Sequence, residues 1–215
     1  MDPWRAGGDP LVSAHLYVEG GGNSKEEKIR CREAFASLLK SQGFGGRMPR
    51  LKACGGRGAA FDDFQTAHAS AKPDHFVGML IDSEDPLSMP TDPRQQQTWL
   101  HLRQRDGWAQ PNGATDDQVL FMTTCMETWI AADRETLRAH YGKELNENQL
   151  PRTTQLESCH RHTVENALKN ATSACSNAYR KGKRSYEVLG KLQPAVLAAL
   201  LPSFARAMAI LEQKL

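Results

Sequence analysis

The sequence predicts an α/β protein with a mostly parallel sheet, and two observations support this fold class. Short apolar runs at 15–18, 49–54 and 75–81 predict buried strands, and stretches whose apolar residues recur at helical spacing lie between them. Glycine-rich turns at 20–22 and 55–58 follow the first two strands. This alternation is typical of a parallel sheet flanked by helices on both faces.

The helices and the fourth strand follow in order. Asn23 or Ser24 is expected to cap a helix over 25–42, and a second helix is expected over 59–70. Residues 87–117, with three prolines, predict a long surface excursion. A fourth strand is expected at Val119–Met122, and Asp133 can cap a helix that runs to about residue 140.

The chain divides into three parts by composition. Residues 1–10 predict a flexible leader, residues 11–142 the α/β domain, and residues 143–215 a helical C-terminal extension packed on it. Helices are expected in the extension over three ranges: 157–175, 185–192 and 195–213, the last broken at Pro202.

Composition excludes several classes of protein. With 215 residues, 40% hydrophobic and 24% charged, the chain has the make-up of a globular protein of one large domain. A net charge of +2 does not mark a nucleic-acid binder, so any such surface must be a local patch. The five scattered cysteines indicate reduced thiols, and the run 159–162 with Cys175 fits no standard zinc finger. The longest apolar run, 195–201, is too short to span a membrane, so we expect a cytoplasmic protein without a membrane partner.

Acidic residues follow two of the predicted strands. Glu19 closes the first strand before three glycines, and Asp82, Glu84 and Asp85 close the third. Right-handed crossovers place the carboxyl ends of parallel strands at one edge, so Glu19, Asp82 and Glu84 are expected to converge there. Because clustered carboxylates repel one another, they favour a divalent cation such as Mg²⁺, which favours phosphoryl-transfer chemistry. Glu19 and Asp82 could instead cap a helix or a turn, and Asp85 is an alternative to Glu84.

Two other residues and one basic stretch are weaker candidates. Glu127 lies in an apolar context and needs a partner, which is a metal or a base. Arg57, in the second glycine turn, could contact phosphate or simply be a solvated loop residue. The densest basic cluster, 180–184, is either a solvated linker or a phosphate contact through Lys181, Lys183 and Arg184.

Two of these motifs carry a resemblance to a known fold. Val18-Glu19-Gly20 and Ile81-Asp82-Ser83-Glu84 resemble the motifs of the toprim fold, the metal-binding domain of topoisomerases, bacterial primases and overcoming-lysogenization-defect nucleases. The resemblance implies that Glu19, Asp82 and Glu84 hold Mg²⁺ or Mn²⁺. The chain departs from the family's Asp-x-Asp at Glu84, whose side chain is one methylene longer.

A narrower resemblance covers more of the chain. Tyr17–Gly20, Asp82–Asp85, Met126–Asp133 and the stretch 181–187 look like a family of small toprim-like bacterial proteins. Members are often encoded beside an ABC-type ATPase, in the manner of antiphage nuclease–ATPase pairs. The resemblance implies an ATPase partner and an activity that is latent until the partner releases it.

We therefore expect a Mg²⁺- or Mn²⁺-dependent toprim-type nuclease that cleaves DNA or RNA. Glu19 is expected to hold metal or act as a general base, Asp82 and Glu84 to hold metal, and Glu127 to be an auxiliary acid. Lys183 is the basic residue expected to take part in catalysis. The alternatives are a non-catalytic toprim-fold partner of an ATPase and, third, a nucleotidyl transferase or primase-like enzyme. A homo-oligomer is compatible with the sequence.

Overall fold

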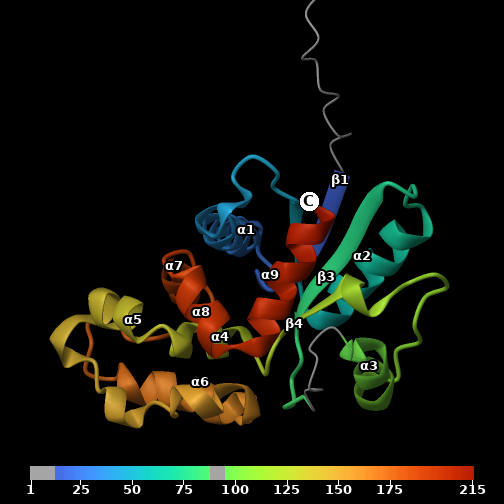
Figure 1. The fold of residues 1–215 in the computed structure, drawn as a ribbon. Coiled ribbons are helices and arrows are strands. Elements are labelled where there is room, and N and C mark those ends of the chain that lie inside the picture. Colours follow the sequence, from blue (N-terminus) through green and yellow to red (C-terminus); the bar gives the residue numbers. More distant parts are fainter. Residues whose placement is uncertain (1–12, 88–94) are drawn as a thin grey trace, which may run out of the picture.

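Four parallel strands in the order β2-β1-β3-β4 form the sheet of the computed structural model, which describes residues 13–87 and 95–215 (Figure 1). The strands are β1 (Ser13–Glu19), β2 (Arg50–Gly55), β3 (His75–Asp82) and β4 (Val119–Met122). β1 is central, with β2 and β3 as parallel neighbours. The predicted α/β class with a parallel sheet is confirmed, whereas the predicted leader at 1–10 lies outside the described residues.

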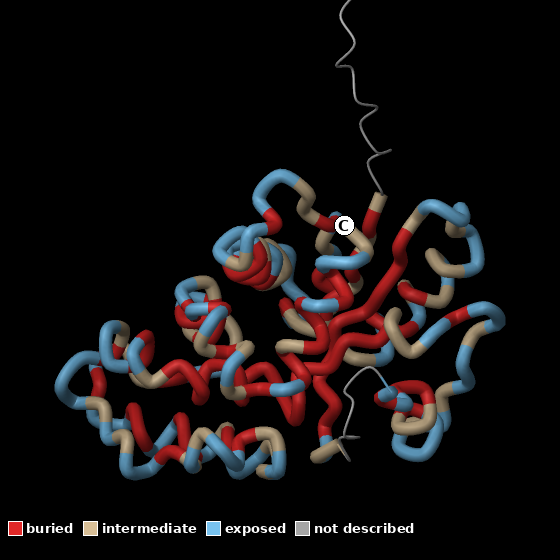
Figure 2. Tube along the Cα trace, viewed as in Figure 1, coloured by how far each residue is buried: buried red, intermediate tan, exposed pale blue. Residues whose placement is uncertain are grey.

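Side chains of the sheet belong to two separate apolar cores. β3 and β4 are buried over almost their whole length (Figure 2). Leu16 and Leu80 point into a large core with α1 (Lys25–Leu39) and the helices that follow β4. Met79 and Phe121 point into a smaller core with α2 (Arg57–Ala69) and α3 (Thr98–Asp106). Burial on both faces explains why the strands are continuous apolar runs.

The first helix follows from its cap and its apolar face. The Ser24 hydroxyl accepts a hydrogen bond from the Glu27 N–H at 3.1 Å, which satisfies one of the free donors at the helix start. The face that contains Cys31, Phe35 and Leu38 is buried against the sheet. The helix ends in a wide turn at Lys40–Phe44.

The predicted excursion over 87–117 is wrong in part, because α3 lies inside it. Trp99 and Leu102 are buried, and the Trp99 ring lies 5.8 Å from that of Phe64 on α2. With three buried side chains in nine residues, the apolar pattern was too weak to predict a helix. Contacts with α2 stabilise it instead. Residues 88–94 of the excursion lie outside the described part of the chain.

Two short helices follow β4 and meet at a buried acid. α4 (Met126–Ala132) ends at Asp133, and α5 (Arg134–Tyr141) begins there. The Asp133 carboxylate accepts hydrogen bonds from the Thr136 N–H at 3.0 Å and the Gln193 N–H at 2.8 Å. Asp133 thus caps α5, as predicted, and also ties it to a segment 60 residues later.

The C-terminal region is helical and shares the large core. Its helices are α6 (Arg161–Ala171), α7 (Lys183–Leu189), α8 (Pro194–Leu200) and α9 (Pro202–Lys214). α6 is shorter than the expected 157–175, because Thr153–Ser158 form a separate 3-10 turn. Leu197, Phe204 and Leu211 belong to the same core as α1 and β1, so these helices pack on the sheet. None of the helices that the structure describes is long and apolar enough to cross a bilayer.

Candidate metal centre

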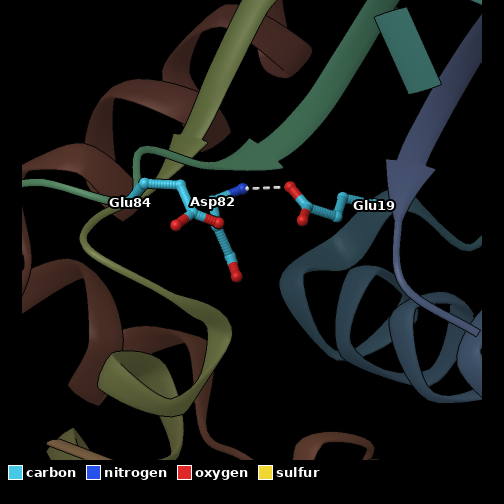
Figure 3. A group of neighbouring side chains, drawn as sticks. All are labelled: Glu19, Asp82 and Glu84. Carbon is cyan, nitrogen blue, oxygen red and sulfur yellow. Dashed lines mark hydrogen bonds between the residues drawn. The ribbon is translucent and has the colours of Figure 1, made fainter. Parts of the chain in front are cut away.

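Glu19 and Asp82 meet at the carboxyl edge of the sheet, where β1 and β3 end side by side. The Asp82 N–H donates to Glu19 Oε2 at 3.0 Å. One carboxylate oxygen from each of Glu19, Asp82 and Glu84 lies within 4.8 Å of the others (Figure 3). The structure therefore brings together the three acids that the sequence placed at one edge.

The glycine turn after β1 has a conformation that other residues rarely adopt. Gly20, Gly21 and Gly22 have φ values of 131°, 88° and 51°. A Cβ on Gly21 would lie 2.8 Å from the Lys28 Cα, closer than any side chain allows. The Gly21 N–H donates to the Tyr186 hydroxyl at 2.6 Å. The turn is thus fixed from α7, a contact 165 residues away that sequence reasoning did not predict.

A cavity of about 290 Å³ lies against these acids. Glu19, Asp82, Glu127 and Lys181 line it together with the glycine turn. Four of its charged groups therefore come from β1, β3, α4 and the loop before α7. The fold therefore brings together charged side chains that are far apart in the sequence.

Asp82 is 7% exposed, and its carboxylate forms no ion pair with any residue that the structure describes. Its Oδ1 accepts a hydrogen bond from the Met126 N–H at 2.8 Å. Burial raises the pKa of Asp82 well above its usual value, and the nearby Glu19 and Glu127 carboxylates add to this while Lys181 opposes it. Burial also raises the pKa of Glu19, against the opposing hydrogen bond from the Asp82 N–H. These carboxylates are held where negative charge is costly, which favours binding of a cation.

Glu127 is fully buried and only half satisfied. The Tyr179 hydroxyl donates to Glu127 Oε1, whereas Oε2 has no hydrogen-bond partner among the described residues. Buried polar atoms are rarely left without a partner, so an orphaned carboxylate oxygen beside a cavity indicates a ligand. The sequence singled out Glu127 by its apolar surroundings, and the structure places it in the cavity lining.

Lys181 is the basic residue of the cavity. Its Nζ donates to Glu165 at 2.9 Å. Although burial opposes the charge, the carboxylates of Glu127, Glu165 and Asp82 raise the pKa of Lys181. By contrast, Lys183 does not line the cavity, and the Arg184 guanidinium donates to the Ala178 carbonyl at 2.7 Å. The chain reverses at Gly182 (φ 95°), which separates the three predicted basic residues.

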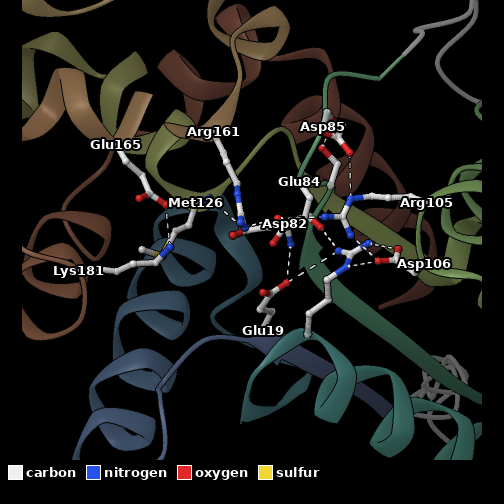
Figure 4. A network of polar contacts seen from close by, with 12 residues as sticks. Glu19, Asp82, Glu84, Asp85, Arg105, Asp106, Met126, Arg161, Glu165 and Lys181 are labelled. Carbon is white, nitrogen blue, oxygen red and sulfur yellow. Dashed lines mark hydrogen bonds and ion pairs between the residues drawn. The ribbon is translucent and has the colours of Figure 1, made fainter. Parts of the chain in front are cut away.

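A second set of acids at the same edge is paired with arginines (Figure 4). We call this set the arginine-paired cluster, and it contains Arg57, Glu84, Asp85, Arg105, Asp106 and Arg161. We call Glu19, Asp82 and Glu127 the unpaired acids, because their closest contact with a cation among the described residues is 4.0 Å, from Arg57 Nη1 to Glu19 Oε2. The two sets lie next to each other but differ in their counter-charges.

Arg57 lies at the boundary between the two sets. Its Nη2 is 2.7 Å from Asp106 Oδ2, and its Nη1 donates to the Asp82 carbonyl. The guanidinium also lies over the Trp108 ring, 5.0 Å from its centre. With 10% of its side chain exposed, Arg57 holds the end of β3 in place, and the phosphate contact expected for it stays a prediction.

Glu84 belongs to both the metal-competent triplet and the arginine-paired cluster. Arg105 and Arg161 both pair with its Oε2, Arg105 at 3.2 Å. No described residue contacts the other oxygen, Oε1. Glu84 also has a φ of 70°, a strained value for a residue with a side chain. One oxygen of its carboxylate lies within 4.8 Å of oxygens of Glu19 and Asp82, and both arginines are bound to Oε2 and not to Oε1.

No zinc centre forms from the cysteines and histidines. Over 13–87 and 95–215, the only group of three or more metal-type ligands that converge is Glu19, Asp82 and Glu84. The five cysteines are free, and four of them are buried. The run 159–162 leads into α6, and Cys175 lies in the turn that follows this helix.

Comparison with known proteins identifies a family but no activity. No curated protein and no solved structure matches the chain. Residues 18–212, which include every acid of the candidate centre, match the family described as "Domain of unknown function (DUF4276)". The chain therefore belongs to the DUF4276 family.

Proposed function

We propose that this protein is a Mg²⁺- or Mn²⁺-dependent nuclease that cleaves phosphodiester bonds of DNA or RNA. The observation that carries the proposal is the convergence of Glu19, Asp82 and Glu84 within 4.8 Å at the ends of neighbouring parallel strands. The donor set is made of carboxylate oxygens, which hard cations such as Mg²⁺ prefer. The orphaned Glu127 Oε2 in the same cavity is an independent sign that a ligand belongs there.

Glu19, Asp82 and Oε1 of Glu84 would hold the cation. When bound, such a cation lowers the pKa of a water molecule and stabilises the charge on a phosphate. Glu127 can accept a proton at Oε2, and Lys181 can orient a phosphate oxygen from the opposite wall of the cavity. Lys181 takes the role that the sequence assigned to Lys183, because Lys181 is the residue that lines the cavity.

A toprim relationship is supported by the order of two motifs. Glu-Gly stands at the end of the first strand and Asp-x-Glu at the end of the third, as in the toprim fold. An ABC-type ATPase partner, a latent activity and an antiphage role rest on the sequence resemblance alone.

A second candidate is a non-catalytic partner of an ATPase. Two arginines already pair with Glu84, and Arg57 lies 4.0 Å from Glu19, so part of the acidic edge is neutralised without a metal. In this case the edge would bind a protein instead of a cation and a phosphodiester.

One set of variants separates the two candidates. Purified protein is titrated with Mn²⁺ by calorimetry and incubated with DNA and RNA, each with Mg²⁺, Mn²⁺ or EDTA, using wild type, Glu19→Gln and Asp82→Asn. Asp62→Asn, an exposed acid on α2, is the matched control. The nuclease proposal expects Mn²⁺ binding and metal-dependent cleavage in wild type and Asp62→Asn, and loss of both in the other two variants. Binding without any cleavage, or cleavage that survives in Glu19→Gln and Asp82→Asn, contradicts it.

A further inference from the structure

A groove of about 400 Å³ lies on the outer side of α1, next to the edge strand β2. Basic side chains dominate its lining, which is made of Asn23, Lys25, Lys28, Ile29, Arg32, Leu51, Lys52 and Ala53. Four of the eight lining residues are cationic and none is acidic. A chain with a net charge of +2 therefore concentrates positive charge at this place.

The charge follows from a segregation along α1. Lys25, Lys28 and Arg32 are spaced by three and four residues, so they form one stripe on the helix. Glu26 pairs with Arg30 at 2.6 Å on a different flank, near Glu187 of α7. The acids of α1 thus face the C-terminal helices, and the cationic stripe faces β2.

Three of the four cations have no counter-charge in contact. Lys52 pairs with Asp63 of α2 at 2.8 Å. Lys25, Lys28 and Arg32 make no ion pair with any residue in the described ranges. Unpaired cations that line a hollow favour an anionic ligand, because each is free to contact one.

The groove and the acidic cavity lie on two sides of the same glycine turn. Gly22 and Gly55 line the cavity, whereas their neighbours Asn23 and Ala53 line the groove. Lys28 connects the two, because its Cε lies 3.8 Å from the point where a Cβ on Gly55 would sit. A ligand that filled both would pass Gly22 and Gly55, beside the Glu27 carboxylate and the Lys28 side chain.

We propose that Lys25, Lys28 and Arg32 bind the phosphodiester backbone of a nucleic-acid strand and guide it over Gly20–Gly22 into the acidic cavity. This inference deepens the proposed function, because it makes the substrate a polymer with phosphates beyond the cleaved bond. A mononucleotide would fill the cavity without reaching Lys25 or Arg32. Contacts of this kind depend on charge, so binding is sensitive to salt and tolerant of sequence.

The test compares two triple variants that lose the same charge. Lys25→Gln/Lys28→Gln/Arg32→Gln removes the stripe, and Lys143→Gln/Arg152→Gln/Lys169→Gln removes three exposed cations that line neither the groove nor the cavity. Binding of a labelled DNA duplex, a single-stranded DNA and an RNA of the same sequence is followed by fluorescence anisotropy in EDTA. EDTA prevents metal-dependent cleavage, so binding is measured alone.

The stripe variant is expected to bind about 10- to 100-fold more weakly than the control variant, and its salt slope on the duplex to fall by roughly 2 to 3, since each lost phosphate contact removes about 0.9. Equal affinity in the two variants overturns the proposal. The proposal is also overturned if the stripe variant loses binding to anionic lipid vesicles but binds all three nucleic acids as the control variant does.

Cleavage assays separate this inference from the proposed function. If the wild type binds through the stripe but no metal supports cleavage, the groove assignment stands and the nuclease proposal falls. If the wild type cleaves and the stripe variant cleaves with an unchanged KM, the nuclease proposal stands and the groove assignment falls. Glu19→Gln should keep stripe-dependent binding in EDTA, because its side chain does not line the groove.

Discussion

The arginine-paired cluster and the unpaired acids share one sheet edge but have opposite electrostatic environments. In the first set, Arg105 alone contacts three carboxylates, and Arg161 and Arg57 add two more ion pairs. In the second set, Asp82 and Glu127 are buried and form no ion pair with any residue in 13–87 or 95–215. The two sets differ in the cations that neighbouring elements supply. After β3, α3 supplies Arg105 to the paired cluster. The wall of the cavity supplies Lys181, whose ion pair is with Glu165.

The comparison shows which acids stabilise the fold and which have another use. Carboxylates paired with arginine lose little by being partly buried, whereas unpaired ones cost free energy of folding. Proteins keep such costly groups mainly at functional sites, so the unpaired acids are the better candidates for chemistry. The four predictions below test this division, from the largest expected effect to the smallest.

Arg57→Met breaks the buried part of the paired cluster. Arg57 and Asp106 are only 10% and 11% exposed, so the variant removes a buried bidentate pair and leaves Arg105 as the remaining cation on Asp106, and we expect a loss of about 3 kcal/mol in the free energy of unfolding. Urea unfolding measures it. The double variant Arg57→Met/Asp106→Leu should regain most of the loss. A single variant within about 1 kcal/mol of wild type would mean that the pair does not stabilise the fold.

Removal of metal should affect the acids proposed to hold it and leave Asp85 without effect. Mg²⁺ at about 100 times its Kd should raise the free energy of unfolding by roughly 2.7 kcal/mol relative to EDTA, because a ligand that binds the folded state stabilises it. The gain should vanish in Asp82→Asn and persist in Asp85→Asn, whose side chain pairs with Arg105. The measurement is urea unfolding with Mg²⁺ and with EDTA. An equal gain in both variants would place the metal elsewhere.

Tyr179→Phe removes the last hydrogen bond of Glu127. The hydroxyl donates to a buried carboxylate, and hydrogen bonds to charged groups are the stronger ones, so we expect a loss of about 2 kcal/mol. Tyr141→Phe is the matched control, since the Tyr141 hydroxyl is buried with no partner in the described part of the chain and should be lost at little cost. Thermal unfolding compares them. Similar losses in the two variants would show that Glu127 does not depend on Tyr179.

Arg105→Gln makes the paired cluster more like the unpaired one. Its side chain is 29% exposed and its ion pairs are partly solvated, so the loss of stability should stay below about 1 kcal/mol. Removing a cation from Glu84 Oε2 should tighten Mg²⁺ binding by about threefold, or roughly 0.6 kcal/mol. Calorimetric titration with Mg²⁺ measures the affinity. Weaker binding in this variant would exclude Glu84 from the metal site.

Sequence reasoning was strongest where the signal is local. Strand β4 follows from an apolar run of four residues, and the caps at Ser24 and Asp133 follow from residue type and position. The meeting of Glu19 and Asp82 was predictable because parallel strands in right-handed crossovers end at one edge.

The rest of the site depends on contacts between distant residues. Arg57 and Asp106 are 49 positions apart, and the helix that carries Asp106 was not predicted. Lys181 and Lys183 differ in direction because of the backbone turn at Gly182, which the sequence does not show. The spacing of Lys25, Lys28 and Arg32 places them on one side of α1. The sequence alone does not show that β2 lies beside them, so the groove was not predicted.

The hydrogen bond from Gly21 to Tyr186 has a consequence for synthesis of the protein. Glu19 leaves the ribosome early, yet the hydroxyl that fixes its turn and the Tyr179 and Lys181 side chains of the cavity emerge more than 150 residues later. A nascent chain with only the sheet formed has acids but no finished site. Competence therefore arrives only once α7 has been made and packed, so that translation itself delays any activity of this protein.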